Sequence, residues 1–99
     1  MSREIIVKPP AQHDIDEAFI WYEKALDNLG FEFLLSLEAV IEAIKRNPEH
    51  AGFAYKHIRS IALMRFPFSV YYIVETEVII VLAVFHHSRN PVEWEQRTE

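Results

Sequence analysis

The sequence of 99 residues has no cysteine and only two glycines, Gly30 and Gly52. Without cysteine the chain has no disulfide, no thiolate metal ligand and no cysteine nucleophile. With so few glycines it has no glycine-rich phosphate loop and no glycine-flanked serine of the hydrolase type. Standard nucleotide-binding and hydrolase sites are therefore excluded.

Long apolar runs are also missing. The longest uninterrupted one, Val78 to Phe85, is far shorter than the roughly 20 residues that a membrane-spanning helix needs. The first residues do not show the charged and then apolar pattern of a signal peptide. We therefore expect a cytoplasmic protein that does not contact a membrane.

A surplus of basic groups is absent as well, since the formal net charge is −5. Residues 1–54 carry five basic and ten acidic groups, whereas residues 55–99 carry five of each. Proteins that hold a phosphate backbone usually show a clear basic surplus. We therefore expect no sequence-specific binding of nucleic acid by the chain alone.

The first half of the sequence predicts a strand and two helices. A β-branched stretch at 3–8 predicts the strand, and Pro9-Pro10 suits the first turn of a helix. Gly30 is expected to end this helix in a left-handed conformation, with Asp14 on its polar face. The apolar stripe of the first helix comprises Ala11, Ile15, Ala18, Phe19, Tyr22, Leu26 and Leu29.

A second helical stripe follows at once and ends before Pro48. Its apolar residues are Phe31, Leu34, Leu37, Ile41 and Ile44, with Phe33 and Val40 beside them. The pattern then changes period and predicts a loop at 48–56 and strands at 57–66, 68–74 and 78–87. The last strand is apolar on both faces, which favours an interior position in the sheet.

Pro91 and the acidic residues beside it predict a short terminal helix. The element order is then β-α-α-β-β-β in one domain that spans residues 1–99. We expect an α+β fold in which a helical hairpin packs on one face of a mainly antiparallel sheet.

Two adjacent histidines, His86 and His87, end the last predicted strand. Neighbours on a strand point to opposite faces, so the two rings do not readily share a metal ion. Simple alternation groups His86 with Ile80, Leu82 and Val84. No other histidine stands at a ligand spacing from them, and we expect neither a metal site nor a cofactor.

Acid–base chemistry at this strand end is one of two interpretations. A metal-free ribonuclease needs a base, an acid and cations around the phosphate. His86 or His87, with Arg59, Arg65 and Arg89, would supply these groups. In the other interpretation one histidine ends the strand and the arginines form ion pairs with acidic side chains. Residue types alone favour this structural interpretation.

Five short motifs occur in order along nearly the whole chain. They are Ala11 with Asp14 and Ile15; Tyr22; Pro48 to Gly52; Arg65 to Phe68 with Val70 and Tyr72; and His86 with Arg89, Pro91 and Trp94. Together they resemble the ParE/RelE superfamily of bacterial toxins, most closely its ParE-like plasmid stabilisation branch. The final motif is the most specific of the five.

The resemblance implies the toxin of a type II toxin–antitoxin module. Its ParE-like branch implies an inhibitor of DNA gyrase without nuclease residues. The alternative, a RelE-like ribosome-dependent mRNA endoribonuclease, would use His86, His87, Arg65 and Arg89. A third possibility is a decayed toxin that only binds its antitoxin. The charge of −5 and the lack of a terminal catalytic tyrosine favour the ParE branch.

On the ParE interpretation we expect Arg89, Trp94 and Arg97 to form a surface that contacts the target, with Arg65 and Arg59 as further contact residues. The expected partner is a ParD- or RelB-like antitoxin. We predict that it lays an amphipathic helix in an apolar groove left by the two helices and the sheet.

Overall fold

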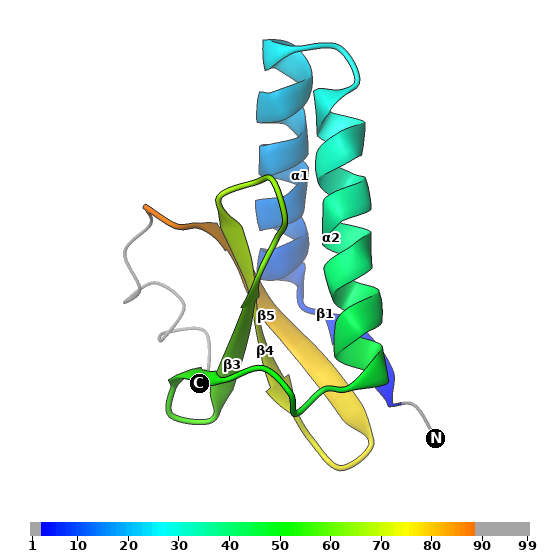
Figure 1. Ribbon diagram of the computed structural model, residues 1–99, viewed down its shortest axis with the longest axis vertical. Coiled ribbons are helices and arrows are strands. Elements are labelled where there is room, and N and C mark those ends of the chain that lie inside the picture. Colours follow the sequence, from blue (N-terminus) through cyan, green and yellow to red (C-terminus); the bar gives the residue numbers. More distant parts are fainter. Residues whose placement is uncertain (1–2, 89–99) are drawn as a thin grey trace.

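The computed structural model describes residues 3–88, in which two long helices lie against a five-stranded sheet (Figure 1). The predicted α+β class with a helical hairpin on a sheet is confirmed. No helix within residues 3–88 has both the length and the apolar composition of a membrane span. The elements are, in order, β1 (Glu4–Val7), α1 (Pro9–Ala25), α2 (Leu29–Arg46), β2 (Phe53–Tyr55), β3 (Ile58–Ala62), β4 (Phe68–Val74) and β5 (Val78–His86).

The sheet has the strand order β1-β5-β4-β3-β2. Only the β1–β5 pair is parallel, so the sheet is mainly antiparallel as predicted. Strand β5 lies between β1 and β4, in the interior position that its two apolar faces require. The prediction of a loop throughout 48–56 is wrong, because it contains β2. This strand is three residues long and exists through its pairing with β3, which local sequence does not reveal.

The turn of the helical hairpin differs from the prediction at Gly30. Helix α1 ends at Ala25, the left-handed residue is Asn28 with φ 74°, and Gly30 lies inside the first turn of α2. The carboxylate of Glu23 accepts hydrogen bonds from the N–H groups of Asn28 (2.9 Å) and Gly30 (3.0 Å). Gly30 is needed for close approach, because a Cβ there would lie 2.7 Å from the carbonyl oxygen of Phe19.

The main core lies between the hairpin and the sheet. Rings from the helices and from the β3–β4 corner meet in it, and Phe33 packs edge-on against Phe66 with centroids 5.5 Å apart. Leu26 and Phe31, predicted within the apolar stripes, are 63% and 55% exposed. They belong to the end of the hairpin that extends beyond the described strands of the sheet, at the top of Figure 1.

A β-bulge interrupts the register between β4 and β5. Tyr71 pairs with Ala83, but the next residue, Tyr72, pairs with Val81, so Leu82 is an extra residue in β5. A bulge places two residues of one strand opposite one residue of its neighbour and shifts the alternation of the side chains that follow. Leu82 and Ala83 consequently both belong to the buried cluster that excludes Val81.

The bulge overturns the predicted alternation of β5, and the packing of α1 against β5 overturns a second prediction. Simple alternation placed Val84 and His86 with Ile80 and Leu82, but Val84 packs in the core beneath the helices, and Ile80 and Leu82 belong to the other cluster. Asp14 was predicted on the polar face of α1, yet it is only 4% exposed and accepts a hydrogen bond from the N–H of Val84. The carboxylate of Asp14 is therefore bound to β5 instead of facing solvent.

Candidate functional site

The two histidines at the end of β5 have different partners. The ring of His86 lies edge-on to Phe68, with centroids 5.2 Å apart, and its Nδ1 is 3.0 Å from the N–H of Ser88. Nε2 of His87 lies 2.9 Å from the hydroxyl of Ser69. Phe68 and Ser69 are neighbours on β4 and point to opposite faces of the sheet. The two imidazoles are therefore held on opposite faces of the sheet.

Arg65 is tied to the start of α2. Its Nη2 donates to Glu32 Oε1 over 2.7 Å, and its guanidinium carbon is 5.6 Å from the centre of the Phe66 ring. The backbone of Arg65 has φ 74°, which is uncommon for a residue with a side chain. The β3–β4 corner thus holds this cation against α2.

Arg59 binds to the loop that precedes β2. Its Nη1 donates to the carbonyl oxygens of Glu49 (3.0 Å) and Ala51 (2.6 Å). The guanidinium also stacks over the ring of Phe53, 4.0 Å from its centre. These contacts close the 49–53 loop onto β3, which gives Arg59 a structural role.

The sheet register separates Arg59 from the histidines. Arg59 pairs with Tyr72, whereas His86 pairs with Phe68, four positions along the same strand. At about 3.3 Å per residue this is roughly 13 Å along the strand. The remaining predicted contact residues, Arg89, Trp94 and Arg97, lie outside the described residues, and so does the predicted terminal helix.

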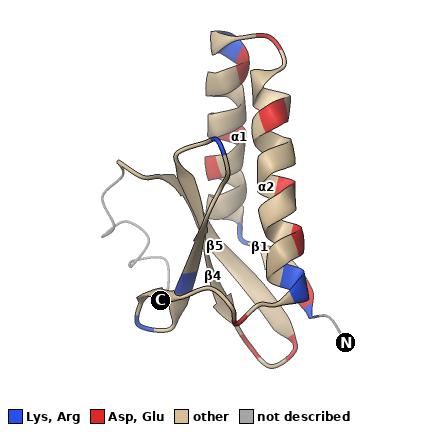
Figure 2. Ribbon diagram, in the orientation of Figure 1, with Lys and Arg blue, Asp and Glu red and all other residues tan. Residues whose placement is uncertain are grey.

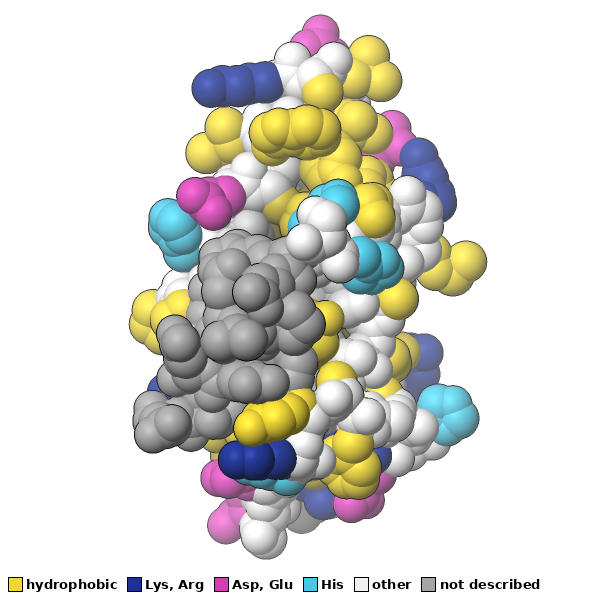
Figure 3. Space-filling model, turned by 90° about the vertical axis from the view of Figure 1, so that its left-hand side faces the viewer, with side chains coloured by type: hydrophobic (Ala, Val, Ile, Leu, Met, Phe, Trp, Pro, Cys, Tyr) yellow, Lys and Arg dark blue, Asp and Glu magenta, His cyan; other side chains and the backbone are white. Residues whose placement is uncertain are grey.

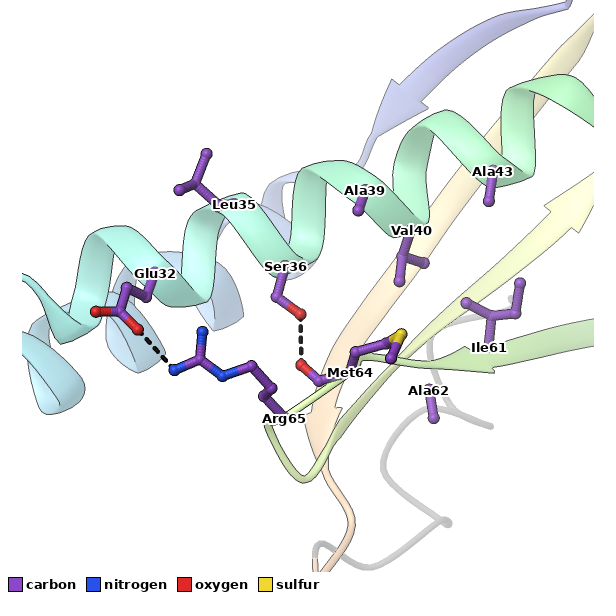
Figure 4. Close-up of a pocket in the computed structure, with 10 residues that line it drawn as sticks. All are labelled: Glu32, Leu35, Ser36, Ala39, Val40, Ala43, Ile61, Ala62, Met64 and Arg65. Carbon is purple, nitrogen blue, oxygen red and sulfur yellow. Dashed lines mark hydrogen bonds and ion pairs between the residues drawn. The ribbon is translucent and has the colours of Figure 1, made fainter.

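A first groove, the α2 groove, runs between α2 and the end of β3 (Figure 4). Its volume is about 490 Å³. Three of the residues on the α2 side, Ser36, Ala39 and Ala43, have short side chains, and this leaves room between α2 and β3. The lining residues are Glu32, Leu35, Ser36, Ala39, Val40, Ala43, Ile61, Ala62, Met64 and Arg65.

The rim of the α2 groove is apolar, and polar contacts join α2 to the segment that follows β3. Leu35 and Met64 are 65% and 78% exposed. The hydroxyl of Ser36 donates to the carbonyl oxygen of Met64 over 2.7 Å, and the Glu32–Arg65 ion pair lies at one end, as Figure 4 shows. The groove is therefore an apolar channel with a charged end.

A second groove, the α1 groove, lies between α1 and the ends of β4 and β5. Its volume is about 470 Å³, and a neighbouring hollow of about 440 Å³ continues it beneath Trp21 toward Pro67. Figure 3 shows this side of the molecule, where hydrophobic side chains gather on the upper half. The lining residues are Asp14, Glu17, Ala18, Ile20, Trp21, Lys24, Phe68, Val84 and His86.

Comparison with known proteins gives the family. Residues 5–91 match the family model described as ParE toxin of type II toxin-antitoxin system, parDE. The chain belongs to the ParE toxin family. It is therefore the toxin of a type II toxin–antitoxin system, as the motifs predicted, and it has an antitoxin as its partner.

Two named relatives and two solved structures agree with this. The chain is 34% identical over 92 residues to Toxin ParE2 of Mycobacterium tuberculosis, in strains CDC 1551 / Oshkosh and ATCC 25618 / H37Rv alike, covering 92% of this chain and 88% of the relative. The fold matches a chain of the chromosomal ParDE system from P. aeruginosa with a TM-score of 0.74 at 18% identity, over 86% and 96% of the two chains. A copper-bound mutant toxin from Helicobacter pylori matches with a TM-score of 0.60 at 22% identity, over 89% and 97%.

The sequence predicted an apolar groove left by the two helices and the sheet, but its motifs did not identify the lining residues of either groove. The α2 groove combines residues of α2 with Met64 and Arg65, and α2 was interpreted only through its buried stripe. The α1 groove did leave a signal, because Ile20 and Trp21 are large apolar residues outside the predicted apolar stripe of the first helix. Two such residues side by side on a polar face indicate a surface with a partner.

Proposed function

We propose that this ParE toxin inhibits DNA gyrase without cutting nucleic acid, and that its antitoxin silences it by laying an amphipathic helix in the α2 groove. The observation that supports the first part most is the separation of the nuclease candidates. The second part rests on the shape and lining of the α2 groove.

Nuclease chemistry needs its groups together. An acid, a base and at least one cation must reach the same phosphate, each within hydrogen-bond distance. In the described residues the imidazoles of His86 and His87 bind on opposite faces of the sheet, and Arg65 is engaged by Glu32 on α2. This arrangement supports a toxin that acts by binding.

The distribution of charge supports the same conclusion. The acidic residues lie mainly on the helical hairpin and in the turn between β4 and β5, as Figure 2 shows. Binding to ribosomal RNA relies on counterion release by clustered cations. A chain with a formal net charge of −5 is poorly suited to that surface and better suited to a protein target.

The α2 groove fits an antitoxin helix. A partner helix presents apolar residues at helical spacing, and they need an apolar channel of about one helix width. The exposed Leu35 and Met64 would lie on either side of such a helix, and the short side chains Ala39 and Ala43 would allow close approach. The Glu32–Arg65 ion pair at the charged end would lie beside polar groups of the partner.

Two assays on the purified toxin test the target. We expect loss of DNA supercoiling by gyrase, and no new cleavage in primer extension on translated mRNA. Cleavage of translated mRNA that His86→Ala or His87→Ala abolishes would contradict the proposal and favour the ribosome-dependent endoribonuclease. Antitoxin binding without either effect would indicate a decayed toxin.

A single substitution tests the groove. Ala39→Glu introduces a carboxylate into the apolar channel, and burying it against a partner helix should weaken antitoxin binding at least about tenfold. Gyrase inhibition should persist. Ala25→Glu is the matched control, since Ala25 is exposed and lines neither groove. Equal antitoxin affinity for the two variants would exclude this docking site.

A further inference from the structure

Helix α1 carries an exposed stripe with a regular charge order. Glu17, Ile20, Trp21 and Lys24 are spaced at i, i+3, i+4 and i+7, so they share one face of the helix. Ile20 is 51% exposed and Trp21 is 67% exposed, although both are large apolar side chains. The stripe therefore has an acidic end, an apolar centre and a basic end.

The order of charges along this stripe is complementary to that of a second, antiparallel copy of the same stripe. When two identical helices pack antiparallel about a two-fold axis, the residues that face each other have numbers with a constant sum. An axis midway between Ile20 and Trp21 places Glu17 opposite Lys24 of the partner subunit, and Lys24 opposite Glu17 of the partner subunit. The apolar pair then meets its own copy at the centre. A parallel pair would instead oppose like charges.

We propose that two copies of this chain associate through this stripe, with α1 packed antiparallel to α1 of the second copy. A two-fold interface must be self-complementary, and the charge order of α1 meets that condition. A partner of unrelated sequence has no reason to require it. Within residues 3–88, Lys24 makes no ion pair with a carboxylate of its own chain, so it is available to one from the second copy.

The α1 groove supplies the cavity that such a pairing needs. Trp21 stands at the edge of the groove of about 470 Å³, beside Phe68 and Val84. The projecting Trp21 side chain and the groove are therefore neighbours on one surface. In the proposed two-fold dimer, Trp21 of each copy then faces the groove of the other copy. Buried tryptophans at the centre of an interface contribute much of its affinity.

The proposed dimer leaves the α2 groove open. Among the described residues the two grooves share no lining residue, so a toxin dimer retains two antitoxin sites. The contact covers about two helical turns and the groove beside them. An interface of this size belongs to the weak class, and we expect reversible dimers whose population rises with concentration.

Sedimentation equilibrium of the full chain over a range of concentrations tests the dimer. We expect a reversible monomer–dimer equilibrium that Trp21→Ala weakens on the order of a hundredfold, because the substitution removes both central side chains. Leu35→Ala is the matched control, since Leu35 is equally exposed (65%) but lines the other groove. A wild-type chain that stays monomeric, or an unchanged Trp21→Ala dimer, would overturn the proposal.

A charge swap tests the antiparallel register. Glu17→Lys should weaken the dimer about tenfold at low salt. At each end of the stripe the substitution places a positive charge opposite Lys24 of the partner subunit, where the two repel each other. The double variant Glu17→Lys with Lys24→Glu should restore it, since both members of each pair are then reversed. These positions are exposed, and far-ultraviolet circular dichroism checks that each variant is folded.

A double variant as weak as the single one would show that Glu17 and Lys24 do not face each other, and would overturn the proposed pairing. Loss of antitoxin or gyrase binding in Trp21→Ala, with a wild-type chain that is monomeric, would assign this face to that partner instead.

Discussion

The carboxylate of Asp14 in α1 accepts a hydrogen bond over 3.1 Å from the backbone N–H of Val84 in β5, 70 positions further along the chain. Strand β1 ends at Val7, opposite Val81, and within residues 3–88 no strand pairs with that side of β5 beyond this point. Asp14 supplies the acceptor that a longer β1 would have provided. The contact joins the first helix to the last strand.

Asp14→Ala should destabilise the fold. A hydrogen bond to a charged group contributes about 1.5–3 kcal/mol, and its loss leaves the N–H of Val84 buried without this partner. The melting temperature should fall by roughly 4–8 °C per kcal/mol in a domain of this size. Urea unfolding of both variants measures the difference, with Asp16→Ala as control. Asp16 is exposed and, among the described residues, accepts a side-chain hydrogen bond from Gln12 alone, so its loss should cost under about 0.5 kcal/mol.

Gly30→Ala should be destabilising although Gly30 is helical. Alanine would gain up to about 1 kcal/mol of helix propensity. Its Cβ would however lie 2.7 Å from the Phe19 carbonyl oxygen and 2.9 Å from a Phe19 ring carbon. Relieving this overlap between two helices typically costs about 1–3 kcal/mol, which exceeds the gain.

Gly52→Ala is the control for Gly30. Nothing lies within 4 Å of a Cβ at this position, and neither glycine has a positive φ. We expect Gly52→Ala to be neutral or stabilising by up to about 1 kcal/mol, through the lower entropy of the unfolded chain. The melting temperature should therefore fall for Gly30→Ala and stay unchanged or rise for Gly52→Ala, and a similar fall in both variants would refute the packing argument.

Stability should fall in alkaline solution, in part through Tyr72. Burial raises the pKa of Tyr72 above its ordinary value of 10.0, while the positive charge of Arg59 acts in the opposite direction. Below the unfolded pKa the phenol is neutral in both states and its contribution is fully present. Above it the unfolded state ionises first, so stability is lost as the pH rises through the folded pKa.

Tyr72→Phe should therefore have two effects. It removes the hydrogen bond from the Tyr72 hydroxyl to the Pro48 carbonyl oxygen (2.9 Å), which costs about 1 kcal/mol near neutral pH. It also makes the loss of stability above pH 10 less steep. Burial also raises the pKa values of Tyr22 and Tyr71, so part of the slope should remain. Urea midpoints across this pH range measure both effects.

Arg89 remains a prediction from sequence, because it lies outside the described residues. Arg89→Ala should leave the melting temperature nearly unchanged and abolish growth inhibition. Arg89→Lys should rescue little, since it lacks the planar fork of donors. If Arg89 only pairs with Glu93, four residues on, both variants stay toxic. Arg65→Ala is then the next test, at a stability cost under about 1 kcal/mol for an exposed ion pair.

Local sequence was sufficient for most of the framework. Strand β4 was predicted at 68–74 and occurs at Phe68–Val74, and α2 ends just before Pro48, as proline requires. Such features depend on residues that are close in sequence, through side-chain period and backbone restrictions. The motifs also sufficed for the family, because they combine residue types that few other folds require in that order.

Features that depend on distant residues were beyond local patterns. The extra residue Leu82 in β5 becomes visible only through the register with β4, and it turns Val84 toward the helices. The burial of Asp14 and the close approach at Gly30 follow from partners in another element. Alternation and helical period assume regular elements, so they fail where two elements adjust to each other.

The same division holds for the candidate sites. The sequence placed His86 and His87 on opposite sides, because adjacent strand residues alternate whatever surrounds them. Arg59 and Arg65 remain predicted target contacts, and only the fold reveals that Arg59 binds the 49–51 loop and Arg65 binds α2. Both grooves arise where a helix lies beside a strand from another part of the chain, and only tertiary packing brings such surfaces together.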